Sequence, residues 1–323
     1  MTTRPDVVVV GAGVIGLTTA LRVQERGARV TVLTADDADR IVSTVAAAVW
    51  YPSHTDEDPR VLRWARTTYA VLAGQAADGV AGVVQRPTRM LVRDRFPRPP
   101  WWAEAVGDLV VHPADPPYSA QLRFTAPTVE MVPYLAWLHD RVVAGGGRVL
   151  RHRVAHLAEA FTPPGSAPVD TVVNATGLAA GHLAADPAVH PVRGHVVLVA
   201  NPGLTTSVRD EQDPAGITYV HPRRHDVVLG GTFDPRRSDT DPDPATARAI
   251  RDRCVALVPR LADAPVLGER IGLRPARHGG PRVEAEQADG TGRRLIHSYG
   301  HGGAGVTLAW GCADEVARLA VPG

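Results

Sequence analysis

Lysine is missing from this chain of 323 residues, so all 35 of its basic residues are arginine. Three enzyme classes depend on a lysine amine. Pyridoxal-phosphate enzymes form a Schiff base with it, while P-loop nucleotide hydrolases and protein kinases use it to hold phosphate groups. The abundance of Arg, Ala, Gly, Pro and Val is typical of a GC-rich coding sequence. Whatever the cause of the absence, the sequence excludes these three classes.

Cysteine is scarce, because the chain has only Cys254 and Cys312. Two cysteines are too few for a disulfide framework, and their spacing does not match a zinc or redox motif. We therefore expect a reducing environment and no structural metal.

Long apolar runs are also missing. No run approaches the roughly 20 residues that a membrane-spanning helix needs, and the first residues lack the basic segment of a secretory signal. The 35 basic residues nearly balance the 34 acidic ones, which leaves a net charge of +1 and no strong field for nucleic acid or an anionic membrane. We expect a cytoplasmic protein whose partner is a small molecule, with no nucleic acid and no membrane.

A glycine-rich loop between two predicted strands is the clearest feature that is present. Residues 6–10 and 29–33 are β-branched runs typical of buried parallel strands, and a helix is predicted over 13–25. Between them, Gly11, Gly13 and Gly16 permit a tight turn, a close approach to a pyrophosphate, and close packing of the helix on the strand. This strand, loop, helix and strand order predicts a dinucleotide site.

The acid that usually follows the second strand of such a site is missing. NAD enzymes place a carboxylate there to bind the ribose hydroxyls, but this chain has Thr34. Asp36 lies slightly further on and could reach the ribose or serve as a loop cap. The presence of Thr34 in place of an acid argues slightly against a nicotinamide cofactor, but it does not by itself decide between NAD and FAD.

The remainder of the chain predicts a discontinuous organisation. Helices are expected over 60–77, over 128–144 with Thr128 as its cap, over 244–257 and over 303–319; strands are expected over 171–174, 196–200, 217–221, 227–231, 270–273 and 294–298. The middle strands alternate with turn residues, as in an antiparallel sheet. We therefore assign residues 1–55, 137–190 and 270–323 to a nucleotide-binding domain, and residues 56–136 and 191–269 to an inserted domain.

Several motifs in order along the chain carry a family resemblance. They are the glycine loop within 9–17, the run 45–50, Val173-Asn174-Ala175-Thr176-Gly177, the run 191–194, Tyr219 with Pro222, Arg274-Pro275-Ala276-Arg277, and Tyr299-Gly300-His301-Gly302-Gly303-Ala304-Gly305 with Trp310-Gly311. In these motifs the chain resembles the D-amino-acid oxidases, FAD enzymes of the glycine-oxidase-like superfamily. The resemblance implies an α/β FAD-binding Rossmann-type domain with a parallel sheet, and an inserted α+β substrate-binding domain built on a mainly antiparallel sheet.

The resemblance also implies an activity. Such an enzyme oxidises D-amino acids to 2-oxo acids, ammonia and hydrogen peroxide by hydride transfer from the substrate α-carbon to flavin N5, with dioxygen as the final acceptor. It implies that Arg277 grips the substrate carboxylate, that Tyr219 donates to the same group, and that the backbone carbonyl of Gly303 receives the ammonium. From spacing alone Arg277 could instead form a structural ion pair. No residue is expected to act as a catalytic acid or base, and His301 is expected to be structural or close to the flavin.

The FAD-binding residues that the resemblance implies come from four parts of the chain. They are Gly11, Ala12, Gly13, Val14, Ile15, Gly16, Asp36, Ser43, Thr44, Ala47, Ala48, Gly177, Gly300, Gly302, Gly303, Gly305, Val306 and Thr307. We further expect the closing helix, entered at Gly303, to direct its positive end towards the flavin.

Residues 201–218 depart from the family pattern because they contain no aromatic residue, where relatives often carry a lid tyrosine. We expect a short or open loop in which Arg209 meets solvent or an acidic side chain, and we favour solvent. Arg209, Arg223 and Arg224 nevertheless keep open the D-aspartate branch, which needs an extra cation. The sequence favours neutral D-amino acids. The alternatives are a D-aspartate oxidase, a glycine or sarcosine oxidase, a NAD-dependent dehydrogenase and a non-catalytic flavin-binding protein, and a homodimer is compatible with each.

Overall fold

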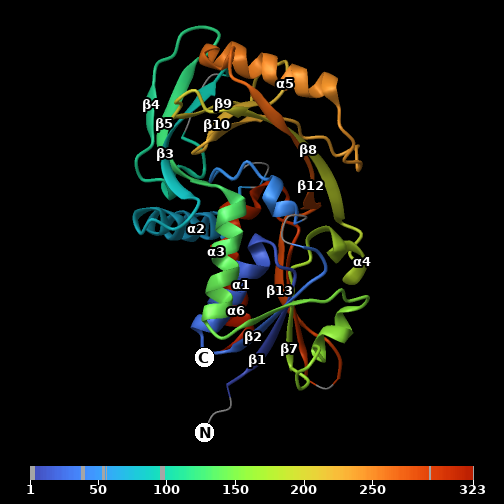
Figure 1. Ribbon diagram of the computed structural model, residues 1–323. Coiled ribbons are helices and arrows are strands. Elements are labelled where there is room, and N and C mark those ends of the chain that lie inside the picture. Colours follow the sequence, from blue (N-terminus) through green and yellow to red (C-terminus); the bar gives the residue numbers. More distant parts are fainter. Residues whose placement is uncertain are drawn as a thin grey trace.

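The computed structural model describes residues 4–37, 41–52, 55, 57–94, 99–290 and 292–322. Within these residues the strands form two sheets, one of six strands and one of eight. Figure 1 shows the six-stranded sheet with α1, α3 and α6 in the lower half of the molecule, and the eight-stranded sheet with α5 in the upper half. The predicted fold class, a Rossmann-type domain with a second α+β domain, is confirmed.

The six-stranded sheet has the order β13-β14-β7-β1-β2-β6 among the described residues. Its strands are β1 (Asp6–Val10), β2 (Arg29–Thr34), β6 (Arg148–Arg151), β7 (Thr171–Asn174), β13 (Arg282–Gln287) and β14 (Arg294–Tyr299). All neighbours are parallel except β13 and β14. The valines of β1 are buried because the strand is covered on both faces, which is why its sequence is continuously apolar.

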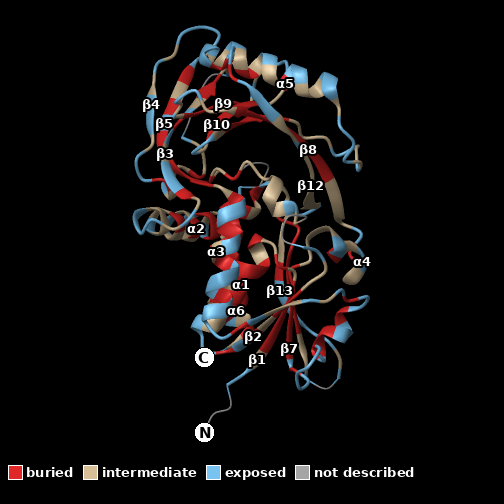
Figure 2. Ribbon diagram, viewed as in Figure 1, coloured by how far each residue is buried: buried red, intermediate tan, exposed pale blue. Residues whose placement is uncertain are grey.

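Four helices pack together below the eight-stranded sheet. They are α1 (Val14–Glu25), α2 (Pro59–Ala77), α3 (Met131–Ala144) and α6 (Gly305–Ala320). The first helix packs against α3 and α6, and α2 packs against α6. Figure 2 shows that buried residues concentrate on the strands and on the inner sides of these helices. No helix in the described part of the chain is both long and apolar enough to cross a membrane.

The eight-stranded sheet has the order β12-β8-β11-β10-β9-β3-β5-β4 over the described residues. Its strands are β3 (Val83–Val92), β4 (Val110–His112), β5 (Ala120–Val129), β8 (Val189–Ala200), β9 (Ser207–Asp210), β10 (Thr218–Pro222), β11 (Asp226–Gly230) and β12 (Val266–Arg277). On one face, Val197, Val199 and Val220 pack with Ile250 and other residues around α5 (Pro244–Leu257). Alternate residues of the same strands face the opposite way, as the two-residue period of a strand requires.

Two contacts in the structure differ from those that the predicted segments suggest, although the domain limits themselves remain predictions. Residues 270–277, which we assigned to the nucleotide-binding domain, continue β12, and this strand pairs with β8 from Val266 to Arg277. In addition, α2 lies against α6 although we placed residues 59–77 in the inserted domain. Both differences arise from contacts between residues far apart in the chain.

Two local predictions are wrong. Thr128 does not cap a helix: it belongs to β5 and pairs with Val84, and α3 begins only at Met131. Residues 201–218 are not one loop, because they contain β9, which pairs with both β3 and β10. In each case sheet pairing determines the conformation of residues whose local composition favours a cap or a loop.

We expect Gly311→Ala to destabilise the protein. A Cβ atom at Gly311 would clash with the backbone of Trp64, where α6 crosses α2, and the Gly311 amide donates to Thr68 Oγ1 at 3.0 Å. Overpacking of this kind costs roughly 1–3 kcal/mol. The midpoint of thermal unfolding of the FAD-loaded protein should therefore fall.

Gly74→Ala is the matched control, because Gly74 is exposed on α2 and a Cβ there meets nothing within 4 Å. This substitution should stabilise the helix by roughly 0.5–1 kcal/mol. Equal thermal midpoints for the two variants would contradict the packing explanation.

Candidate functional site

A cavity of about 900 Å³ lies between the two sheets. On one side it is lined by the carboxyl ends of the parallel strands, including Val10, Leu33, Ala175 and Ser298, and on the other side by residues of the eight-stranded sheet. The carboxyl ends of a parallel sheet are the usual ligand position in folds of this type. The volume is near the upper end of the roughly 300–1,000 Å³ range of ligand pockets.

The glycine loop forms one end of the cavity. Gly11 has φ of 116°, a conformation that favours glycine, and a Cβ there would clash with the carbonyl of Ala175. A Cβ at Gly16 would clash in turn with the carbonyl of Gly11. Gly16 therefore lets α1 pack closely on the strand, and the start of α1 opens towards the cavity.

The start of α1 suits an anionic group. Gly13 occupies the N-cap, and the amide of Val14 donates to Ser43 Oγ at 3.2 Å. Amides in the first turn of a helix lack carbonyl partners within the helix and favour phosphate. Asp36 lies at the same end of the cavity and accepts from Arg153 Nη2 at 3.1 Å. The loop, the helix end and Asp36 together fit a dinucleotide.

The opposite end of the cavity is formed by the loop between β14 and α6. Gly300, His301, Gly302 and Gly303 all line it. A short 3₁₀ turn (Gly302–Ala304) precedes α6, so the regular helix begins two residues later than the predicted entrance at Gly303. Burial lowers the pKa of His301 to about 4, so its imidazole is neutral at neutral pH. Among the described residues, its buried Nε2 has no hydrogen-bond partner, which leaves this atom available to a ligand.

Most of the FAD-binding residues predicted from the sequence lie along this cavity. Its lining includes Gly11, Ala12, Gly13, Val14, Ile15, Asp36, Ser43, Ala47, Ala48, Gly177, Gly300, Gly302, Gly303, Gly305, Val306 and Thr307. Gly16 and Thr44 lie outside the lining that the described residues form. Gly16 packs on the loop, and Thr44 lines a smaller cavity with its hydroxyl donating to the carbonyl of Ile41 at 2.8 Å.

Arg274 is the arginine of its motif that lines the cavity. Its Nη1 donates to the carbonyl of Thr232 at 3.0 Å, and its guanidinium lies so close to Gly194 that a Cβ there would clash with it. A Cβ placed on Gly303 would lie 3.7 Å from Arg274 Cδ, so the arginine and the glycine loop are neighbours. This arrangement holds a cation beside the Gly303 backbone.

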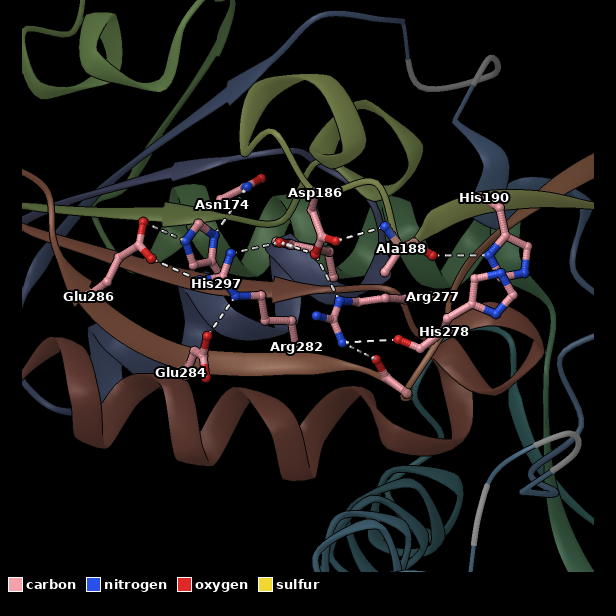
Figure 3. A network of polar contacts seen from close by, with 12 residues as sticks. Asn174, Asp186, Ala188, His190, Arg277, His278, Arg282, Glu284, Glu286 and His297 are labelled. Carbon is pink, nitrogen blue, oxygen red and sulfur yellow. Dashed lines mark hydrogen bonds and ion pairs between the residues drawn. The ribbon is translucent and has the colours of Figure 1, made fainter.

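Arg277, which the resemblance assigned to the substrate carboxylate, lies outside the cavity lining that the described residues form, whereas Arg274 belongs to it. Arg277 Nε donates to Asp186 Oδ2 at 2.8 Å, and its Nη1 donates to the carbonyls of His278 and Gly280, both at 3.3 Å (Figure 3). The positions 274 and 277 are three apart on β12, and residues an odd number apart on a strand point to opposite faces. Arg277 therefore forms a structural ion pair with Asp186, which was the alternative that its spacing in the sequence allowed.

Asp186 joins Arg277 to the six-stranded sheet. The Tyr299 hydroxyl of β14 donates to Asp186 Oδ2 at 2.9 Å, and Arg282 Nη1 donates to the same hydroxyl at 3.0 Å. Figure 3 shows this network extending through Arg282 to Glu284. The hydrogen bond from Arg277, assisted by that from Tyr299, lowers the pKa of Asp186 to about 2. The network connects the end of β12 to the neighbouring sheet.

Tyr219 lies on β10 with its side chain buried at the cavity. Burial raises the pKa of its hydroxyl, which therefore stays protonated and can donate a hydrogen bond. Its ring stacks on His221 with the centroids 4.6 Å apart. Burial also lowers the pKa of His221 well below its usual range. The site thus offers a neutral hydroxyl donor supported by a neutral imidazole.

A charged pair in the cavity was missed by the sequence analysis. Arg209 is buried there rather than solvated as expected, and it pairs with Glu211, which also lines the cavity. Tyr51 joins the pair: its hydroxyl donates to Glu211 Oε2 at 3.1 Å, and its ring centroid lies 3.5 Å from Arg209 Cζ. Residues 207–211 read Ser-Val-Arg-Asp-Glu and show no apolar, polar alternation, so the sequence carried no signal for a strand that places residues 209 and 211 on one face.

The other two arginines that kept a D-aspartate branch open lie elsewhere. Arg223 pairs with Asp226 at 2.6 Å and lines the smaller cavity. Arg224 lies outside both cavity linings of the described residues, and its backbone amide donates to Glu130 at 2.7 Å. Of the three, Arg209 is the arginine positioned to meet a substrate.

Comparisons with known proteins show the family and the fold. A family model described as FAD dependent oxidoreductase, DAO, matches residues 6–319. A D-amino-acid oxidase of Rubrobacter xylanophilus is 47% identical over 97% of this chain and 95% of the relative. A D-amino-acid oxidase of Streptomyces coelicolor is 42% identical over 98% of this chain and 96% of the relative. The solved structure of glycine oxidase from Geobacillus kaustophilus shares the fold, with a TM-score of 0.83 and 21% identity over 99% of this chain and 95% of that one.

We expect Asp186→Asn to destabilise the protein at neutral pH, by on the order of 1–3 kcal/mol, because it removes a charged acceptor from Arg277 and Tyr299. The pKa of this carboxyl is about 2 in the folded chain and about 3.8 ordinarily, so its stabilisation is complete above about pH 4 and is lost as the pH falls towards 2. The difference in thermal midpoint between wild type and variant should therefore be larger at pH 7 than at pH 3.

Asp140→Asn is the control, because the Asp140 side chain is 81% exposed on α3. It should leave the midpoint nearly unchanged at both pH values. A difference for Asp186→Asn that stays constant between pH 7 and pH 3 would argue against the ion pair as its cause.

Proposed function

Because this chain belongs to the DAO family of FAD-dependent oxidoreductases, we propose that it oxidises D-amino acids. A D-amino acid, dioxygen and water are converted into a 2-oxo acid, ammonia and hydrogen peroxide. The observation that carries the proposal is one continuous cavity that joins a dinucleotide loop at Gly11 to Arg274, Tyr219 and Gly303. Membership of this family favours FAD over NAD and an oxidase over a nicotinamide-dependent dehydrogenase.

The residues at both ends of the cavity fit FAD. The glycine loop and the first amides of α1 would hold its pyrophosphate, and Asp36 would meet the ribose. The loop from Gly300 to Gly303, with the unpaired Nε2 of His301, would border the flavin ring. Bound FAD supplies a two-electron acceptor that takes a hydride from the substrate α-carbon and is reoxidised by dioxygen.

Three groups of the chain would hold the substrate. Arg274 offers a planar pair of donors to the carboxylate, and Tyr219 adds a protonated hydroxyl. The carbonyl of Gly303, next to Arg274, would receive the ammonium. Two fixed anchors and a rigid third point determine which face of the α-carbon is presented, and such positioning can supply a large part of a rate enhancement.

The chain's own contribution is binding and orientation rather than proton transfer. The imidazoles of His221 and His301 have lowered pKa values because they are buried. Neither residue is therefore assigned as an acid. The substrate would react as the free amine, with its ammonium proton released to bulk water and an amine N–H still donating to the carbonyl of Gly303. We accordingly assign no catalytic acid or base.

Neutral side chains fit the cavity best. Ile217, Val196 and Phe233 are apolar residues of the lining, and the charge of Arg209 is balanced by Glu211. D-aspartate oxidation is the second candidate, because Arg209 lies on the cavity and could bind a side-chain carboxylate. A cytoplasmic location, a homodimer and the limits of the two domains remain predictions from the sequence.

The function is tested by measuring peroxide release from the FAD-loaded protein with D-alanine, L-alanine, glycine and D-aspartate in parallel. We expect the highest kcat/KM with D-alanine, because the anchors select one enantiomer and the lining is neutral. Activity confined to L-alanine would contradict the proposed stereochemistry. Protein that takes up no FAD would contradict the flavoenzyme assignment.

Arg274→Ala should raise the KM for D-alanine by on the order of 100-fold, since it removes a desolvated charged contact to the carboxylate. Bound FAD should be retained. Arg277→Ala is the matched control: it removes an arginine three residues away and should lower the thermal midpoint while changing KM far less. The opposite pattern, with the larger KM change at Arg277, would restore the sequence-based assignment.

A further inference from the structure

Arg209 and Glu211 bring opposite charges to the substrate end of the cavity. In the β9–β10 pairing Arg209 lies directly opposite Tyr219, so both side chains project from the same face of the sheet. Glu211, two residues further along, returns to that face, whereas Asp210 points to the other side and binds Arg93. The pair thus stands beside the proposed carboxylate-binding tyrosine.

Both members of the pair act on Tyr219 through their charge. The pKa of Tyr219 is raised first by burial, then lowered by Arg274 and by Arg209, and raised slightly by Glu211. The Tyr219 hydroxyl therefore lies within the electric field of two guanidinium groups, those of Arg274 and Arg209. A substrate whose α-carboxylate binds Arg274 would extend its side chain into the region that Arg209 and Glu211 share.

Arg209 depends on Glu211 as its partner in this region. The Arg209 side chain is 6% exposed and the Glu211 side chain is 21% exposed. A buried charge is costly unless it is paired, and Glu211 supplies the partner while the Tyr51 hydroxyl donates to its second oxygen. The pair is therefore neutral as a unit, although the Arg209 guanidinium still lines the cavity.

We propose that Glu211 determines the substrate class of this oxidase by neutralising Arg209. With Glu211 present, the pair carries no net charge, so the site for the substrate side chain accepts neutral groups. It offers no free cation to a second carboxylate. When Glu211 is replaced by an uncharged residue, Arg209 binds that carboxylate and dicarboxylic D-amino acids become substrates. The inference rests on the proposed function and names its specificity-determining residue.

The test compares kcat/KM for D-aspartate, D-glutamate and D-alanine in wild type, Glu211→Gln and Glu211→Ala. We expect the ratio of D-aspartate to D-alanine to rise roughly 10- to 100-fold in both variants, the effect of a gained hydrogen bond to a charged group. The dissociation constant of malonate, followed by the absorbance of bound flavin, should fall by a similar factor, while that of acetate should change little.

Three control variants separate this effect from general damage. Glu211→Asp keeps the charge and should keep the wild-type ratio. The double variant Arg209→Met, Glu211→Gln should lose the gain, because no cation remains. Asp210→Asn removes an acid from the opposite face of β9 and should leave the ratio unchanged.

The outcomes distinguish the inference from the proposed function. Wild type that oxidises none of D-alanine, D-aspartate and D-glutamate would refute the proposed function itself. Wild type that oxidises D-alanine, with ratios and malonate affinity unchanged in both Glu211→Gln and Glu211→Ala, would overturn the role of Glu211 alone. A gain that persists in the double variant would overturn it as well, because Arg209 would then not be the group that binds the second carboxylate.

Discussion

The pairing of β12 with β8 is the constraint on which the site depends. It extends from Val266 to Arg277 and holds the last residues of β12 between the two sheets. Because the strand alternates, the same pairing directs Arg274 into the cavity and Arg277 towards Asp186 on the other side. One arginine is thereby available to a substrate while the other fixes the strand that carries it.

The parts of the site that local chemistry determines could be predicted from the sequence. Gly11 is required by its own φ value and by the closeness of a neighbouring carbonyl, so the glycine loop could be located from its residue types. The FAD family and the fold class were correctly inferred from the resemblance of motifs along the chain. The choice between Arg274 and Arg277 depends on which face of β12 meets the cavity, and that is set by pairing with a distant strand. The burial of Arg209 likewise depends on its cross-strand partner Tyr219. A pattern of residue types does not contain these contacts.

The absence of lysine is reflected in how cations are placed. The guanidinium of Arg274 lies close against Gly194, and that of Arg209 lies over the ring of Tyr51. Both arrangements need a planar cation, since a compact ammonium cannot stack or present two parallel donors in the same way. A chain without lysine therefore places arginine at every cationic position, and the planar guanidinium of arginine is well suited to binding carboxylates.

Thr307 gives the two ends of the cavity a physical connection. Its hydroxyl accepts from the amide of Tyr51 at 3.1 Å and donates to the carbonyl of the same residue at 2.9 Å, which ties α6 to the segment whose ring contacts Arg209. Coupling between two binding sites is reciprocal. If bound substrate raises the affinity for the cofactor by some factor, bound cofactor raises the affinity for the substrate by the same factor.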